Sequence, residues 1–301
     1  MRRLPLIAVT GLVAAGLSLS ACGSDSMSTD TGGAPTGAGT SVGGGVDPAL
    51  VAKLPAKIKS SGKIIVGIDP TYAPNEMLAA DGKTVEGLNV DIFNAVAAKF
   101  GVTAEYQPSK FDAIILGVTG GKYDVGVSSF SINDERKKVV NMVSYYRAGT
   151  QWVVRKGNPK DVSIDDPCGK SIGVQAGTTQ LADLTARNKK CTAAGKPGIT
   201  MLVQDGQDQV TTDLISGKSD AMLADSPVGL YAIAQTNGQL EALGDIYDSA
   251  PYGIVIPKDE TEFANAVVEA LKEAKADGSY EAALKKYSVE AGAISDFALN
   301  P

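Results

Sequence analysis

The amino-acid sequence predicts an α/β protein with two lobes, and three features of the chain support this prediction. From Asp47 onward, short runs of β-branched residues alternate with amphipathic segments, which is the pattern of strands covered by helices. The chain after residue 46 is also too long for one ordinary core. Two apolar stretches with small residues, 149–153 and 250–254, could carry the chain between two lobes. A double crossover of this kind would act as a hinge.

The composition of the chain excludes several classes of protein. Of its 301 residues, 44% are hydrophobic and 21% are charged, a balance typical of globular proteins. The formal net charge of −6 argues against nucleic acid as a partner, because phosphate backbones repel an acidic protein. The chain has no histidine, which excludes Ser-His-Asp and Cys-His hydrolases, HExxH zinc sites and histidine general bases. We therefore expect neither a metal site nor a cofactor.

Residues 1–21 are predicted to be a lipoprotein signal peptide. Basic Arg2 and Arg3 precede an apolar stretch, and small residues stand just before Cys22. Cleavage there would leave Cys22 as a lipid-carrying N-terminus. An uncleaved membrane anchor is the alternative, because the apolar stretch is close to the ~20 residues that span a bilayer. In both cases the rest of the chain lies at the outer face of the cytoplasmic membrane, and residues 22–46, rich in Gly, Ser and Thr, form a flexible tether.

The two remaining cysteines are Cys168 and Cys191. An oxidising compartment outside the cytoplasm favours a disulfide between them. The bridge would close a loop of about two dozen residues and contribute ~3 kcal/mol to stability. A metal pair or a redox pair is the alternative, but two thiols at this spacing without histidine neither complete a zinc shell nor form a CxxC motif.

The first lobe is expected to consist of residues 47–150 together with the C-terminal part, 253–301. A continuous β-branched run at 63–68 predicts a buried strand. Apolar residues at helical spacing then predict a helix that stops at Gly101. Further strands are expected at 103–107 and 125–130.

The second lobe is expected to consist of residues 151–252, with strands at 171–175, 200–203 and 221–224. In the C-terminal part of the first lobe, Asp259 and Glu262 have the spacing of a capping box. The helix that follows carries four apolar residues on one face: Phe263, Val267, Leu271 and Ala274. Gly278 is expected to end this helix and Ser279 to start another, with Tyr280, Leu284 and Tyr287 inward.

The loop after the first strand, Asp69-Pro70-Thr71-Tyr72-Ala73-Pro74, is the first candidate for a binding site. It leaves the carboxyl end of a predicted strand, where ligands usually bind in α/β sheets, and it offers one carboxylate and one aromatic ring. A capped turn with a packing tyrosine explains the same residues.

A second strand runs into the hydroxyl-rich loop Ser128-Ser129-Phe130-Ser131, with Arg136 shortly beyond. A guanidinium beside exposed amides and hydroxyls can hold a carboxylate through two parallel hydrogen bonds. A serine-rich turn followed by a solvated helix start is the alternative, and the residues alone favour neither.

Two further candidates lie in the second lobe. Thr178 and Thr179 follow a strand and a glycine, and they open a helix whose free amides attract an anion. An ordinary N-cap explains the same threonines. Asp225 lies just past a buried strand and would suit an ammonium group. The segment 117–123 is not a phosphate loop, because its spacing is one residue short.

In chain order, from about Lys63 to Val289, these segments resemble the polar amino-acid family of extracytoplasmic solute-binding proteins, two-lobed molecules with the type-2 periplasmic binding protein fold. By this resemblance, Asp69 would face the ligand side chain, with Tyr72 and Phe111 as its aromatic walls. The residues that would bind the α-ammonium and α-carboxylate groups are Ser128, Ser129, Ser131, Arg136, Thr178, Thr179 and Asp225. The segment Asn75-Glu76-Met77 departs from the family, in which many members have aromatic residues there, so the edge of the first-lobe pocket is expected to differ.

The resemblance implies a substrate-binding protein of an ABC transporter that serves amino acid transport. It would bind a free amino acid by closing its lobes, and deliver it to a permease in the cell membrane. A monomer that touches the membrane only through its lipid is expected. The alternatives are a dehydratase-like enzyme on the same fold, against which the missing histidine argues, and a ligand-sensing module for a receptor.

Overall fold

The structure is a computed structural model and describes residues 45–301. The predicted signal peptide 1–21, the lipid-carrying Cys22 and nearly all of the tether 22–46 lie outside the described residues. Within residues 45–301, no helix combines the length and the apolar character needed to cross a membrane.

One sheet of eight strands runs through the described residues, which confirms the predicted α/β class. In the order in which they lie side by side, its strands are β5 (Thr103–Pro108), β1 (Lys63–Ile68), β6 (Val125–Gly126), β11 (Leu240–Pro257), β7 (Val140–Arg155), β10 (Ala221–Asp225), β8 (Ser171–Gln175) and β9 (Thr200–Gln204). A small second sheet contains β2 (Thr71–Tyr72), β3 (Glu76–Leu78) and β4 (Val85–Glu86).

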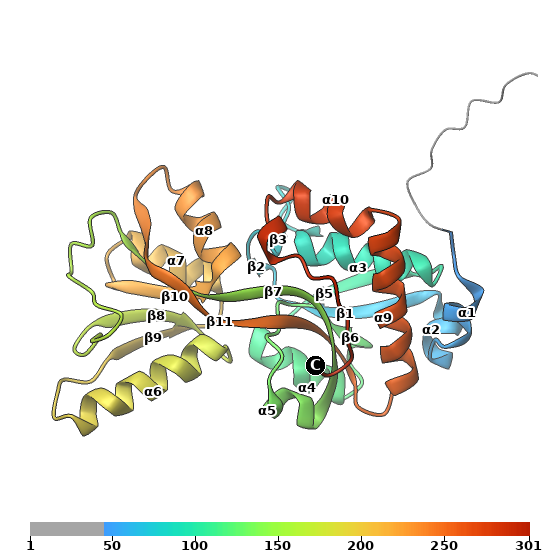
Figure 1. The fold of residues 1–301 in the computed structure, drawn as a ribbon, viewed down its shortest axis with the longest axis horizontal. Helices are drawn as coiled ribbons and strands as arrows, with labels where there is room; N and C mark the ends of the chain where they lie inside the picture. Colours follow the sequence, from blue (N-terminus) through green and yellow to red (C-terminus); the bar gives the residue numbers. More distant parts are fainter. Residues whose placement is uncertain (1–44) are drawn as a thin grey trace, which may run out of the picture. The chain divides into compact units, whose positions relative to one another are not determined.

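Helices cover both faces of the large sheet (Figure 1). Along the chain they are α1 (Pro48–Ala52), α2 (Ala56–Ser61), α3 (Leu88–Lys99), α4 (Phe111–Thr119), α5 (Asp134–Val139), α6 (Thr179–Ala193), α7 (Gln207–Ile215), α8 (Ser226–Gln235), α9 (Thr261–Ala276) and α10 (Ser279–Lys286). A 3₁₀ turn, Glu290–Gly292, follows them.

The first lobe is the part of the structure built on β1, β5 and β6. Alternation along β1 divides its core into two layers, because successive side chains of a strand point to opposite faces. Ile64 and Val66 pack into a cluster with residues of α3 and α9 on one face, and Ile65 packs against a cluster with residues of α4 on the other. The continuous run of apolar residues in the sequence thus marks a strand that is covered on both faces.

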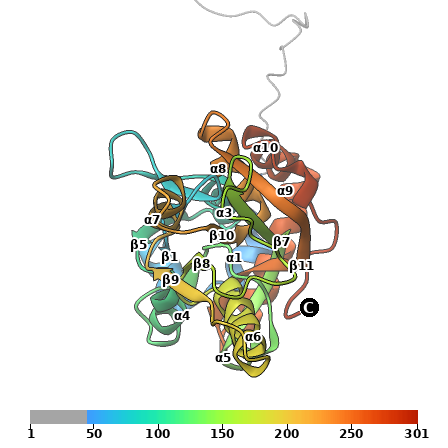
Figure 2. The ribbon, with the colours of Figure 1, turned by 90° about the vertical axis from the view of Figure 1, so that its left-hand side faces the viewer.

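The second lobe is the part built on β8, β9 and β10, with α6 on one face of the strands and α7 and α8 on the other (Figure 2). Trp152 and Val154 pack into the cluster that includes Leu184 of α6, whereas Val153 packs with residues of α7. The predicted disulfide between Cys168 and Cys191 is present and joins the segment before β8 to α6, with 5.5 Å between the two Cα atoms. Cys168 and Cys191 therefore form a structural disulfide.

The long strands β7 and β11 carry the chain between the lobes (Figure 1). The predicted crossovers 149–153 and 250–254 lie within them, and the two strands pair in antiparallel fashion, with Ala250 opposite Ala148. Three register shifts interrupt this pairing, between Leu243 and Tyr247, between Tyr247 and Ala250, and between Tyr252 and Gly253. Irregular pairing disrupts a ladder locally, so these two strands are least regular where the chain passes between the lobes.

Two predictions about the elements are wrong. The strand expected at 125–130 ends at Gly126, because the chain turns toward the neighbouring loops and Ser129 adopts a positive φ of 54°. The capping box expected at Asp259 is absent, since α9 begins at Thr261 after Glu260, which makes no side-chain capping hydrogen bond. The buried face of α9 is as predicted, and Gly278 ends this helix region with a positive φ of 83°.

Candidate functional site

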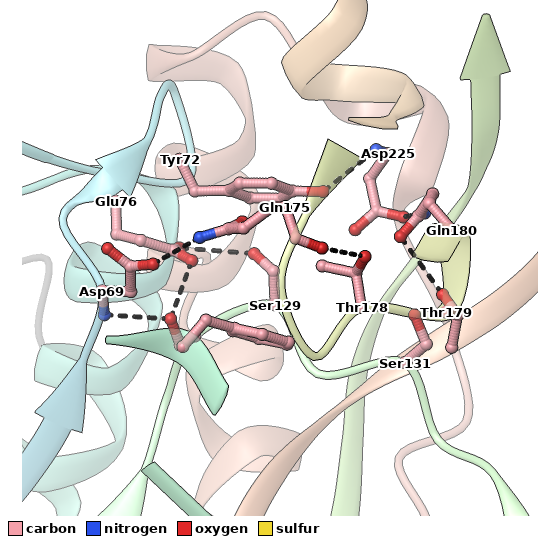
Figure 3. Close-up of a pocket in the computed structure, with 12 residues that line it drawn as sticks. Asp69, Tyr72, Glu76, Ser129, Ser131, Gln175, Thr178, Thr179, Gln180 and Asp225 are labelled. Carbon is pink, nitrogen blue, oxygen red and sulfur yellow. Dashed lines mark hydrogen bonds between the residues drawn. The ribbon is translucent and has the colours of Figure 1, made fainter. Parts of the chain in front are cut away.

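A cavity lies between the two lobes (Figure 3). It is lined by twelve residues from both lobes: Asp69, Tyr72, Glu76, Phe111, Ser128, Ser129, Ser131, Gln175, Thr178, Thr179, Gln180 and Asp225. Nine of the ten ligand-binding residues expected from the sequence are in this set, and Arg136 is the exception. The structure therefore brings together segments that are more than 150 residues apart in the chain.

Asp69 follows the last residue of β1, at the carboxyl end of a central strand, and only 3% of it is exposed. Its carboxylate accepts a hydrogen bond of 2.6 Å from Nε2 of Gln175, a residue of the second lobe. Burial raises the pKa of Asp69 to about 6. The carboxylate is thus held at the junction of the lobes in a setting that disfavours its charge.

Glu76 opens β3 and is fully buried. Its carboxylate accepts hydrogen bonds from the amide of Asn89 and from the hydroxyls of Ser128 at 3.2 Å and Ser129 at 3.3 Å. Burial, followed by the negative charge of Asp69, raises the pKa of Glu76 well above its usual value. A second acid therefore lies beside Asp69, at the position where the sequence departs from the family.

The three serines of the loop after β6 differ in what their hydroxyls do. Ser128 Oγ accepts the Asp69 N–H at 3.0 Å and Ser129 Oγ accepts from the amides of Asn75 and Asn89, both at 3.0 Å. Since both hydroxyls also donate to Glu76, Ser128 and Ser129 serve to hold the acids in place. Ser131 lines the cavity, and its carbonyl oxygen accepts from Arg136 at 2.7 Å.

Arg136 lies on α5 and its guanidinium bridges the lobes. It donates to the carbonyl oxygen of Ser131 in the first lobe and to that of Gly177 in the second, at 2.7 and 3.2 Å. The guanidinium lies over the rings of Phe111 and Phe130, at 5.5 and 5.3 Å from their centroids, and these rings stack on each other. Burial lowers the pKa of Arg136 to about 10. The cation is thus fixed next to Ser131 at the cavity wall.

The second lobe supplies the start of α6 and the end of β10. Thr178 is the N-cap of α6: its hydroxyl accepts the Leu181 N–H at 3.2 Å and donates to the Gln175 carbonyl. The capping alternative is therefore correct for the Thr178 hydroxyl. Thr179, the first residue of the helix, lines the cavity.

Asp225 ends β10 and is only 5% exposed. Its carboxylate accepts hydrogen bonds from Nε2 of Gln180 at 2.7 Å and from the hydroxyl of Tyr252 at 2.8 Å. Its backbone N–H donates to the hydroxyl of Tyr72 at 3.0 Å, which links the second lobe to the first. Burial raises the pKa of Asp225.

The lobes are in contact around the cavity. Beyond the bridges made by Asp69, Tyr72 and Arg136, the hydroxyl of Thr71 accepts the Gln207 N–H at 3.1 Å, and Lys110 pairs with Asp205 at 2.5 Å. The structure therefore represents a closed arrangement of the two lobes.

Three lining residues have no counterpart among the sequence-based candidates: Glu76, Gln175 and Gln180. In the sequence, Glu76 stands out only because its segment departs from the family. Gln175 ends a strand and Gln180 lies in the first turn of a helix. The sequence could have indicated these two residues only as polar residues at the carboxyl end of a strand and at the start of a helix. This signal is weak, because such positions are usually polar for reasons of capping alone.

The charges at the cavity have neutral partners. In the described part of the chain, none of the ion pairs involves Asp69, Glu76, Asp225 or Arg136. Buried charges are costly unless they are paired. The arrangement is thus suited to a ligand that carries charges of both signs.

Comparison with known proteins gives a consistent result. The pattern of the bacterial extracellular solute-binding proteins, family 3, matches residues 64–290. The arginine-binding protein of Corynebacterium glutamicum is 29% identical over 294 residues, which cover 97% of this chain and 94% of that protein. The lysine/arginine/ornithine-binding periplasmic protein of Escherichia coli strain K12 is 31% identical over 238 residues, covering 74% of this chain and 86% of that protein.

Solved structures agree with these relatives. An ancestral arginine-binding protein bound to arginine superposes with a TM-score of 0.70 at 32% identity, covering 75% of this chain and 98% of that one. An ancestral amino acid-binding protein described as a precursor of cyclohexadienyl dehydratase has a TM-score of 0.69 at 28% identity, covering 77% of this chain and 97% of that one. From the family pattern, the relatives and the shared fold, we conclude that this chain belongs to family 3 of the bacterial extracellular solute-binding proteins.

Proposed function

We propose that this protein is the solute-binding subunit of an ABC importer for a polar amino acid. It captures the free amino acid between its lobes and presents the closed form to a permease. The amino-acid-binding relatives support this proposal, because one of them matches 97% of this chain and another matches 74%. We further propose that Cys22 carries lipid and holds the protein at the outer face of the cytoplasmic membrane.

The observation that carries the proposal is the set of charges at one end of the cavity. Asp225, Thr179 and Ser131 lie at this end (Figure 3), and Arg136 donates to the Ser131 carbonyl beside them. The free α-ammonium and α-carboxylate of an amino acid supply the two opposite charges that Asp225 and Arg136 lack. In this pose the guanidinium exchanges a carbonyl partner for the ligand carboxylate, and the start of α6 offers backbone amides to the same group.

Closure follows from the division of these groups between the lobes. We propose that residues 47–150 with 253–301 move as one body and residues 151–252 as the other, about β7 and β11. Arg136 and the serine loop belong to the first body, whereas Thr179 and Asp225 belong to the second. A ligand that contacts both stabilises the closed state by its additional contacts there, and this difference shifts the population toward closure.

A dehydratase-like enzyme is the second candidate, because one structural neighbour is described as a precursor of such an enzyme. The buried acids Asp69 and Glu76, with their raised pKa values, are the kind of group that could transfer a proton. We favour binding without chemistry, since Asp225 and Arg136 carry the two opposite charges that hold a zwitterion. An amino acid recovered unchanged after prolonged incubation with the protein supports binding, whereas conversion of the ligand supports the enzyme.

Isothermal titration calorimetry with each of the twenty amino acids tests the proposal. The full-length protein is studied in detergent, after it has been unfolded and refolded to remove carried-over ligand. Arg136→Ala is expected to weaken binding by about 100-fold, because it removes one partner of a buried charge pair. Lys137→Ala is the matched control: it removes a cation from the next position of α5, where the side chain instead contacts Asp134 and Pro301.

Binding of one or a few polar amino acids, lost in Arg136→Ala and kept in Lys137→Ala, supports the proposal. If no amino acid binds to the refolded protein, the proposed function is wrong.

A further inference from the structure

Two buried carboxylates occupy one end of the cavity. Asp69 and Glu76 lie close together, and the ring of Tyr72 extends from their end toward Asp225 (Figure 3). The exposed fractions of Asp69 and Glu76 are 3% and 0%. The cavity therefore has an acidic end, formed by these two residues, that is separate from the end with Asp225.

The hydrogen-bond partners of the acidic end are all neutral. Asp69 accepts from the amide of Gln175, and Glu76 accepts from the amide of Asn89 and two serine hydroxyls. No lysine or arginine of the described chain forms an ion pair with either carboxylate. In the proposed binding mode, the α-ammonium of the ligand pairs with Asp225 and its α-carboxylate with Arg136, at the opposite end of the cavity. These two groups therefore do not neutralise the negative charge of Asp69 and Glu76.

We propose that Asp69 and Glu76 form a dicarboxylate subsite that selects amino acids with a positively charged side chain, and that Glu76 is the residue that makes this selection. This inference rests on the proposed function and names the substrate class of the same cavity. A guanidinium suits the subsite best. Its planar fork donates to several carboxylate oxygens at once, and it stacks on aromatic rings such as those of Tyr72 and Phe111, which line the cavity.

A neutral amide side chain fits the subsite less well. Two carboxylates this close together cannot both be ionised without a cation, so one of them must hold a proton when a neutral ligand is bound. The raised pKa values of both acids agree with this picture. The titratable groups around the pair, Asp208 of α7, Tyr72 of β2 and Tyr145 of β7, add no positive charge. A cationic side chain therefore displaces a proton, whereas a neutral one does not.

The matched ligands L-arginine and L-citrulline test this inference directly. They have nearly the same shape, but the side chain of citrulline is neutral and has a carbonyl acceptor in place of one donating amino group of the guanidinium. Titration of the full-length protein with both ligands is expected to give about 100-fold tighter binding of arginine, the loss typical of an unpaired buried charge. Repeating the arginine titration in two buffers of different ionisation enthalpy is expected to reveal proton release on binding.

Glu76→Gln is expected to reduce the preference for arginine over citrulline at least tenfold, and Asp69→Asn is expected to do the same if Glu76→Gln does not fold. Asp208→Asn is the control: it removes a negative charge that acts on Asp69 from outside the cavity lining, and it is expected to leave the preference within about twofold.

The outcomes distinguish a failure of the dicarboxylate subsite from a failure of the proposed function. Arginine and citrulline binding with similar affinity, or a preference that Glu76→Gln and Asp69→Asn leave intact, overturns the dicarboxylate subsite while the proposed function stands. If no amino acid binds at all, both fail.

Discussion

Gly177→Ala is expected to weaken ligand binding, because this residue touches the first lobe in the closed structure. A β-carbon at position 177 would lie 2.7 Å from Cβ and 3.1 Å from Cα of Asp112 on α4. Carbon atoms in ordinary contact are about 3.5–4.0 Å apart, so the lobes must separate by about 1 Å to accept the methyl group. Overpacking of this kind costs about 1–3 kcal/mol, which corresponds to about 5- to 150-fold in the dissociation constant.

A second effect of Gly177→Ala has to be separated from the first. Gly177 has a positive φ of 73°, and a residue with a side chain is strained there by roughly 1–2 kcal/mol whether the lobes are open or closed. Gly195→Ala is the matched control. Gly195 lies in the same lobe with a φ of 71°, and nothing lies within 4 Å of the added carbon. Both variants should therefore lose similar stability, but only Gly177→Ala should lose affinity.

Titration calorimetry with the ligand, together with thermal unfolding of the ligand-free proteins, distinguishes these effects. The expected result is a similar decrease in melting temperature for both variants and a weaker dissociation constant for Gly177→Ala alone. Equal affinities of the two variants would refute the reasoning, because the contact between Gly177 and Asp112 would then not belong to the ligand-bound state.

Three further predictions concern other parts of the molecule. Replacing both Cys168 and Cys191 with serine should lower the free energy of unfolding by ~3 kcal/mol, measured by urea denaturation, with little change in affinity because neither residue lines the cavity. Tyr72→Phe removes the acceptor of the Asp225 N–H and should weaken ligand binding about tenfold, measured by calorimetry, through an unpaired buried donor in the closed state. The affinity for a cationic amino acid should be highest above pH 6 and decrease as the pH falls through about 6, since Asp69, with its raised pKa, then takes up the proton that the cation must displace. Constant affinity between about pH 5 and about pH 8 would contradict this linkage.

The fold was predictable from the sequence because its signals are local. The β-branched run at 63–68 and the apolar face of Phe263, Val267 and Leu271 each identify an element without reference to the rest of the chain. The strand expected at 125–130 failed for the opposite reason. Its residues have strand propensity, but Ser128 and Ser129 turn away to bind Asp69 and Glu76, partners more than 50 positions earlier in the chain.

The candidate site was predictable only in part. Strand ends and helix starts are visible in the sequence, and this located the residues that the structure gathers around the cavity, such as Asp69 and Asp225. The role of Glu76 was not predictable, because an exposed turn and a buried acid look alike until Asn89 and the serines are folded against it. Likewise, nothing in the sequence indicates that the Arg136 guanidinium reaches the Gly177 carbonyl across the lobes.

A crystal structure of the protein in complex with the amino acid that binds it most tightly tests the central claim most directly. We expect the ligand to lie between the closed lobes, with its α-carboxylate about 3 Å from the guanidinium of Arg136 and its α-ammonium at Asp225. Its side chain should extend past Tyr72 toward Asp69 and Glu76. A ligand outside this cavity, or one with its α-carboxylate far from Arg136, would contradict the account.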